Sequence, residues 1–140
     1  MFEKPNSITL SGSEYPIKCD MLVLEKVQEK YGDLSAFENR IRRFIPDTDE
    51  KGDYIKNKDG LVVGHYEYPD IAALMDLTYW SICEGMEING NECELTRKEL
   101  VRLIDTTPLE LSEIMHTEYI GAFQRKNQQA AQNRRKSQKN

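Results

Sequence analysis

The stretch Pro69-Asp-Ile-Ala-Ala-Leu-Met-Asp-Leu-Thr-Tyr-Trp-Ser-Ile-Cys-Glu-Gly-Met-Glu87 is the most apolar part of a chain of 140 residues. Its apolar residues recur at spacings of three and four, which predicts a helix over about residues 71–87. The main stripe of this helix consists of Ile71, Leu74, Met75, Thr78, Ile82 and Met86. Leu77, Trp80 and Cys83 point elsewhere, and a helix that is apolar on most sides lies at the centre of a fold or is covered by a partner. We therefore expect this helix to organise the domain and to favour self-association.

Two shorter helices are predicted before it. Asp20 and Asp33 are N-cap residues, whose carboxylates accept hydrogen bonds from the free amides of a first helical turn. They predict helices over about residues 21–31 and 34–44, and Gly32 between the two is a good left-handed helix stop.

Two further helices are predicted after it. Thr96-Arg-Lys-Glu99 and Thr107-Pro-Leu-Glu110 both match the capping box, in which the first and fourth residues satisfy each other's backbone amides. The last helix keeps an apolar face as far as Phe123.

Hairpins are predicted in two places. Residues 7–17 alternate between apolar and polar on either side of a turn at Ser11-Gly12-Ser13. Residues 46–69 hold a polar loop and two apolar runs around a turn at Asn57-Lys-Asp-Gly60, which predicts an inserted second hairpin. The alternative is that the three tyrosines of this insert pack on the helices.

These patterns predict a mainly α fold of the α+β class. We expect a small helical domain with an N-terminal β-hairpin and a second hairpin as an insert. The side chains predicted to be buried are Leu24, Val27, Phe37, Ile41, Leu74, Ile82, Leu103, Ile114 and Met115.

Charge divides the chain into two parts. Residues 124–140 hold six Lys or Arg and no acid, which leaves 19 − 6 = 13 basic and 24 acidic residues, a net charge of −11, for residues 1–123. We predict a helical domain over residues 1–123, with the insert at about 46–69, and a flexible, basic, polar tail over residues 124–140. Such a tail can attract phosphate or the acidic body of a neighbouring copy.

The cysteines and the hydropathy indicate a cellular compartment. Cys19, Cys83 and Cys93 form no CxxC pair, so we expect buried thiols of a cytoplasmic protein rather than a disulfide framework or a zinc site. No stretch approaches the roughly 18 apolar residues that span a bilayer, and no secretory signal begins the chain. We therefore expect no membrane association.

Few residues indicate catalysis. His65 and His116 lie on separate predicted elements, and the aspartates of the loop at 47–53 lack the spacing of an EF-hand. The acids of the last helix, which we interpret as exposed, are Glu110, Glu113 and Glu118. We expect no enzymatic activity, no metal and no cofactor.

The predicted helices over residues 97–123 imitate a helix-turn-helix. A recognition helix approaches phosphates and usually carries Arg or Lys, but no basic residue occurs between Leu103 and Phe123. We therefore expect no specific nucleic-acid binding.

The order of these segments resembles one known family. The hairpin Ile8–Lys18, the helix that ends in Leu24–Gly32, the apolar central helix and the segment Leu95–Asp105 are similar to the tail assembly chaperones of tailed bacteriophages that infect Gram-positive hosts. The resemblance covers about residues 7–45 and 70–123, and the insert lies outside it.

The resemblance implies a non-enzymatic role in viral morphogenesis. Members of this family bind the phage tape-measure protein, keep it soluble and recruit tail-tube subunits. It further implies action in the host bacterial cytoplasm and absence from the mature virion, and we expect a homo-oligomer.

Two other classes remain open, a structural head–tail or tail-completion protein of the virion and a small DNA-binding regulator. The residues that we predict to bind a partner are Leu77, Trp80, Cys83, Leu109, Ile120 and Phe123.

Overall fold

A computed structural model describes the backbone of residues 5–138 and the side chains of residues 5–124. The described elements, in chain order, are β1 (Asn6–Leu10), β2 (Ser13–Ile17), α1 (Met21–Tyr31), α2 (Leu34–Ile41), β3 (Arg43–Pro46), β4 (Gly64–Glu67), α3 (Ile71–Ile88), α4 (Arg97–Leu103) and α5 (Pro108–Gln138). The predicted α+β class, with helices and two small antiparallel hairpins, is confirmed.

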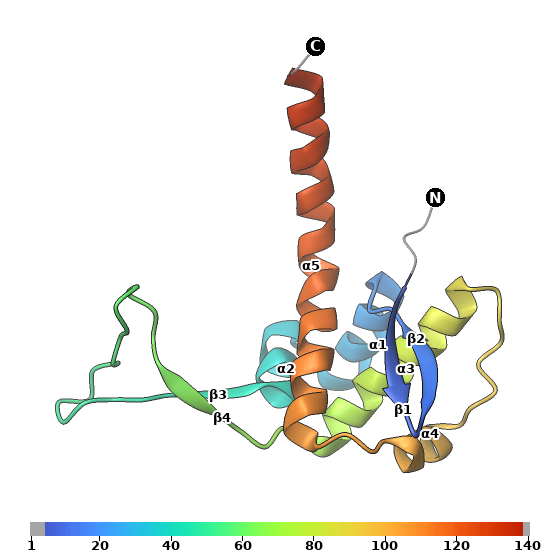
Figure 1. The fold of residues 1–140 in the computed structure, drawn as a ribbon, viewed down its shortest axis with the longest axis horizontal. Helices are drawn as coiled ribbons and strands as arrows, with labels where there is room; N and C mark the ends of the chain where they lie inside the picture. The colour runs from blue at the N-terminus through green and yellow to red at the C-terminus, as the bar shows by residue number, and fades with distance from the viewer. Residues whose placement is uncertain (1–4, 139–140) are drawn as a thin grey trace.

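The α3 helix is the centre of the fold. It packs against β2, α1, α2, α4 and α5, and the other helices and the first hairpin surround it in Figure 1. Leu74, Leu77 and Ile82 of α3 are all fully buried. The chain therefore covers its most apolar helix by itself, so an uncovered α3 no longer gives a reason to expect self-association.

The first hairpin docks directly on α3. Ser11 and Gly12, the two residues between the strands, have positive φ angles of 49° and 80°, as a tight hairpin turn requires. The amide of Lys18, just after β2, donates a hydrogen bond of 2.9 Å to the carbonyl of Ser81 on α3. The hairpin thus covers one side of the central helix.

The helix α2 is shorter than predicted. Both caps are as expected, with Asp20 accepting from the amides of Leu22 and Val23 and Asp33 starting α2 in the same way. However, α2 ends at Ile41, and the predicted helical residue Phe44 lies instead on β3. Ile45 directly precedes Pro46 and so favours the extended conformation. Pairing of Arg43–Pro46 with β4 extends the whole segment.

The insert forms a long projection, which we call the arm (residues 43–68). Strands β3 and β4 pair at its base, and isolated bridges join Thr48 to Tyr54 and Lys56 to Val62 further out. Figure 1 shows the arm reaching away from the helices. The predicted second hairpin is confirmed, but it begins at Arg43, before the predicted start of the insert at about residue 46. Its tyrosines do not pack on the helices, because Tyr54, Tyr66 and Tyr68 are all exposed.

Most of the predicted core is confirmed. The predicted residues that are buried are Leu24, Val27, Phe37, Ile41, Leu74, Ile82 and Met115. Leu103 is only partly buried against the core, and Ile114 is 36% exposed. The prediction for Ile114 is wrong because the buried face of α5 runs through Leu111, Met115 and Tyr119.

Polar contacts fix α5 on the domain. The Ser112 hydroxyl donates to the carbonyl of Ile41, and the Tyr119 hydroxyl donates to the carbonyl of Leu34 at 2.6 Å. Glu118 accepts a hydrogen bond from the Asn6 side chain and is 4% exposed. Its predicted exposure is therefore wrong, whereas Glu110 and Glu113 are exposed as expected.

The predicted tail begins inside α5. The helical backbone continues without a break through Gln138 and leads away from the other elements (Figure 1). The side chains of residues 125–140 lie outside the described part of the structure.

Two of the three cysteines are paired, which corrects the expectation of three thiols. A disulfide joins Cys83 near the end of α3 to Cys93 in the following loop, with 5.1 Å between their Cα atoms. The chain reverses after α3 at Gly90, whose φ is 83°, and this reversal brings the two residues together. Cys19 is buried, as predicted. Among the described helices, none combines the length and the apolar character needed to span a membrane.

Candidate functional site

The structure distributes the six predicted partner-binding residues over several places. Leu77 is fully buried in the core, so its prediction as a surface contact is wrong. Trp80 and Cys83 line a groove between α1 and α3, and Ile120 and Phe123 line another between α2 and α5. Leu109 lies beside β4 at the base of the arm. These residues therefore do not form one binding surface.

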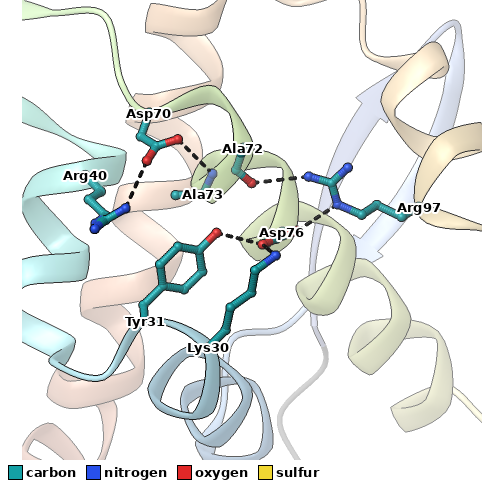
Figure 2. Close-up of polar contacts among 8 residues, drawn as sticks. All are labelled: Lys30, Tyr31, Arg40, Asp70, Ala72, Ala73, Asp76 and Arg97. Atoms are coloured by element: carbon teal, nitrogen blue, oxygen red, sulfur yellow. Dashed lines mark hydrogen bonds and ion pairs between the residues drawn. The ribbon is translucent and has the colours of Figure 1, made fainter.

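The densest group of polar side chains surrounds Asp76 (Figure 2). The Asp76 carboxylate accepts hydrogen bonds from Lys30 Nζ at 2.6 Å, from the Tyr31 hydroxyl at 2.7 Å and from Arg97 Nε at 2.7 Å. Its side chain is 3% exposed, whereas those of Lys30 and Arg97 are about half exposed. A single buried acid thus connects α1, α3 and α4.

The contacts decide the charge of Asp76. Burial alone would raise the pKa of its carboxyl, but the hydrogen bonds from Lys30, Tyr31 and Arg97 outweigh burial and hold the pKa below its ordinary value. Burial and the hydrogen bond to Asp76 raise the pKa of Tyr31 well above the usual range, so its hydroxyl remains a donor.

The neighbouring contacts extend this group to α2. Arg40 pairs with Asp70 at 3.2 Å and lies 5.4 Å from the centre of the Tyr31 ring. Asp70 also caps α3 by accepting from the Ala73 amide. All the polar atoms of Asp76 and Asp70 face partners in the chain, so we interpret the group as a structural link between helices.

The arm carries an apolar surface. Of its large apolar side chains, those that are exposed are Phe44, Tyr54, Ile55, Leu61, Val62, Tyr66 and Tyr68. At the base of the arm, the Arg42 guanidinium lies 3.5 Å from the centre of the Tyr66 ring, and the Phe44 ring lies 5.3 Å from that ring. The Phe44 ring also covers Gly64, where a Cβ would come within 2.7 Å of it. These contacts hold the exposed rings of Phe44 and Tyr66 in place.

The groove between α1 and α3 combines apolar and acidic groups. Leu22, Val23 and Trp80 supply apolar surface around a hollow of about 300 Å³. Its acidic lining residues are Glu25, Glu29, Glu84 and Glu87. With Lys26 as the basic residue of the lining, the groove has a formal charge of −4 + 1 = −3.

Glu84 is the unusual acid of this groove, because it is nine-tenths buried. A hydrogen bond with the Asp20 carboxyl, burial and the negative charges of Asp20 and Glu87 together raise the pKa of Glu84 to about 7. Lys26 offsets only part of this effect. The acidic side chains of the groove are therefore only partly neutralised by its one lysine.

The groove between α2 and α5 is less charged. Leu34, Tyr119, Ile120 and Phe123 line it, and the rings of Tyr119 and Phe123 lie 5.3 Å apart. Glu38 is its acidic lining residue and pairs with His116 at 3.2 Å.

The two histidines lie apart, as predicted. His65 on β4 lies 3.5 Å from Asp47, and His116 lies on α5. In the loop at 47–53, Asp49 accepts from the amides of Lys51 and Asp53 and so closes its own turn. Within the described residues, no group of three or more His, Cys, Asp or Glu side chains is arranged to hold a metal ion.

Comparison of the chain with protein-family models, with curated proteins and with solved structures finds no match. The assignment of function therefore depends on the geometry above and on the resemblance of the segments.

Sequence reasoning missed Asp76 and Glu84 as buried polar groups, and it missed the contact of Glu84 with Asp20. For Asp76 and Glu84 a signal exists, since they are the charged residues within the apolar stretch of α3 before its last turn. A charge that interrupts such a stretch predicts a buried ion pair or a buried protonated acid.

Proposed function

We propose that this chain is a non-enzymatic tail assembly chaperone of a tailed bacteriophage, which binds the tape-measure protein and helps recruit tail-tube subunits. The segments that resemble this family, residues 7–45 and 70–123, contribute the first hairpin and all the helices that pack on α3. This arrangement agrees with a common domain to which the arm is added.

The exposed apolar surface of the arm is the observation that carries the proposal. Exposed apolar side chains that gather on one part of a folded domain are typical of protein–protein interaction sites. On the arm, seven such side chains lie on one projection. Backbone pairing shapes its base, and a ring contact joins Phe44 to Tyr66 there. A chaperone of a long amphipathic helix can use such a surface to cover apolar side chains that its client leaves unpaired.

The test is co-expression with the tape-measure protein of the same phage. We expect the wild-type chain to raise the soluble fraction of the tape-measure protein and to purify with it. The variant Leu61→Ser with Tyr68→Ser should lose most of this gain, because both side chains are about two-thirds exposed on the arm. Since they are exposed, the variant should keep its fold.

The matched control is Ile114→Ser, which removes an exposed apolar side chain from α5 and should keep the solubility gain. Leu77→Asp is unsuitable, because it would place a charge in the core and unfold the chain. Absence of any gain with the wild-type chain would contradict the chaperone proposal, and equal loss in the control would contradict the role of the arm.

One observation favours a second candidate, a structural head–tail or tail-completion protein. The arm and the end of α5 both project from the helical body (Figure 1), as extensions that reach neighbouring subunits do. A structural protein would be found in purified virions at a fixed number per particle, whereas a chaperone would be absent from them.

A further inference from the structure

The groove between α1 and α3 is acidic, and a segment of opposite charge lies elsewhere in the same chain. The groove has a formal charge of −3, whereas residues 125–140 contain no acid. The basic residues of that segment are Arg125, Lys126, Arg134, Arg135, Lys136 and Lys139. The two parts are therefore complementary in charge.

The length of the basic helical segment also fits the length of the groove. An α-helix rises 1.5 Å per residue, so the eleven residues of α1 form a wall about 16 Å long. Residues 125–138, which continue α5 as a helix, extend over about 20 Å. A helix of this length can lie along the part of α1 that lines the groove, from Leu22 to Glu29.

The course of α5 separates the segment from the groove of its own chain. The helix runs unbroken from Pro108 to Gln138 and leads away from α1 and α3 (Figure 1). A continuous helix cannot turn back, so its basic end is placed to reach the groove of another copy.

We propose that the groove between α1 and α3 binds the basic C-terminal segment, residues 125–140, of a second copy of this chain. Glu25, Glu29 and the Glu84–Asp20 pair are the groove's partners for the positive charge of the segment. Leu22, which is 58% exposed, and Trp80 form the apolar part of the groove. This inference does not depend on the proposed function.

The buried acid of the groove, Glu84, adds a physical reason for this occupant. Glu84 faces Asp20 and Glu87, and their repulsion favours the protonated form of its carboxyl near neutral pH. A guanidinium or ammonium group brought to this position would stabilise the ionised form. In the free chain Lys26 supplies only part of the counter-charge of the groove, and the tail carries more.

Sedimentation equilibrium of the nuclease-treated full chain tests the proposal. We expect reversible association at low salt that weakens as salt screens the charges. Glu25→Lys with Glu29→Lys should raise the dissociation constant by about tenfold or more, and Arg134→Glu with Arg135→Glu should do the same. A variant with all four changes should recover most of the affinity, because the charges are exchanged.

The matched control is Glu50→Lys with Glu113→Lys, which makes the same charge change at exposed positions outside the groove and should leave association unchanged. A monomer at every salt concentration would overturn the proposal, and so would groove variants that associate like the wild type. Failure of the four-fold variant to recover, or association that nuclease treatment abolishes, would mean that the tail binds another partner.

Discussion

Gly85 of α3 lies directly against the backbone of Pro16 on β2. A Cβ at residue 85 would come within 2.7 Å of both the carbonyl carbon and the carbonyl oxygen of Pro16. Glycine is unfavourable within a helix, by roughly 1 kcal/mol relative to alanine. Its position here therefore reflects close packing of the hairpin on the central helix rather than a helical preference.

Gly85→Ala should destabilise the domain by about 1–3 kcal/mol, because the atoms it meets are backbone atoms that cannot rotate away. This is the reverse of the usual effect of replacing a helical glycine. Chemical denaturation measures the change, with Ile71→Ala, an exposed change on the same helix, as the control. A midpoint above that of the wild type would show that the hairpin does not approach α3 so closely.

Local signals in the sequence predict much of this fold. Asp20, Asp33 and Thr96 each accept from the amides of the helix that follows, as the capping patterns indicate. The turn at Ser11 and Gly12 also follows from residue types alone. These features depend on residues within a few positions of one another, so periodicity and capping are enough to find them.

Features of the fold that depend on long-range contacts were either not predicted from the sequence or predicted wrongly. Leu77 lies off the main apolar stripe of α3. It is nevertheless buried, because other elements surround that helix on several sides. Phe44 continues the apolar spacing of α2, but it lies on β3, where it pairs with Tyr66 of β4. Periodicity indicates which residues are apolar, but it does not indicate how many sides of an element the rest of the chain covers.

Asp76→Asn should destabilise the domain by about 2–3 kcal/mol. The change removes the negative charge that Lys30 and Arg97 share, and the loss is moderate because both cations are about half exposed. Thermal or urea unfolding at neutral pH measures it. The control is Glu67→Gln, which breaks an exposed pair with Arg43 and should cost less than about 1 kcal/mol.

Asp76→Asn should also change how the stability of the domain depends on pH in acid. The pKa of Asp76 is lowered in the folded state, so its contribution to stability is present above its ordinary pKa of 3.8 and is lost as the pH falls through the lowered value. The wild type should therefore lose its advantage over Asp76→Asn in strong acid. A difference between the two that persists unchanged below pH 2 would contradict the ion pair.

The disulfide predicts a dependence on redox conditions. Linking Cys83 to Cys93, ten positions apart, restricts the unfolded chain and should contribute about 3 kcal/mol. Reductant should lower the unfolding temperature of the wild type and have no effect on Cys83→Ser. Peptide mapping without reductant should recover the linked pair, and recovery of two free thiols from oxidised protein would contradict the pairing.

The Glu84–Asp20 pair predicts the opposite response to pH. Because the pKa of Glu84 is raised from 4.5 to about 7, the protonated carboxyl stabilises the fold. That contribution is complete below pH 4.5 and is lost as the pH rises through 7. The free energy of unfolding should therefore fall in alkaline conditions as Glu84 ionises.

Glu84→Gln should remove this loss, because the amide keeps a donor for Asp20 and carries no charge. The variant should match the wild type near pH 4.5 and exceed it at pH 8 by up to roughly 3 kcal/mol, the free energy of a pKa difference of about 2.5. Urea unfolding across this range measures the difference, and it should be done with chains that end at Gln124, so that a tail bound in the groove does not neutralise Glu84. Equal stability of the two proteins at pH 8 would show that Glu84 ionises as an ordinary surface acid, and the groove would then lack its buried unbalanced charge.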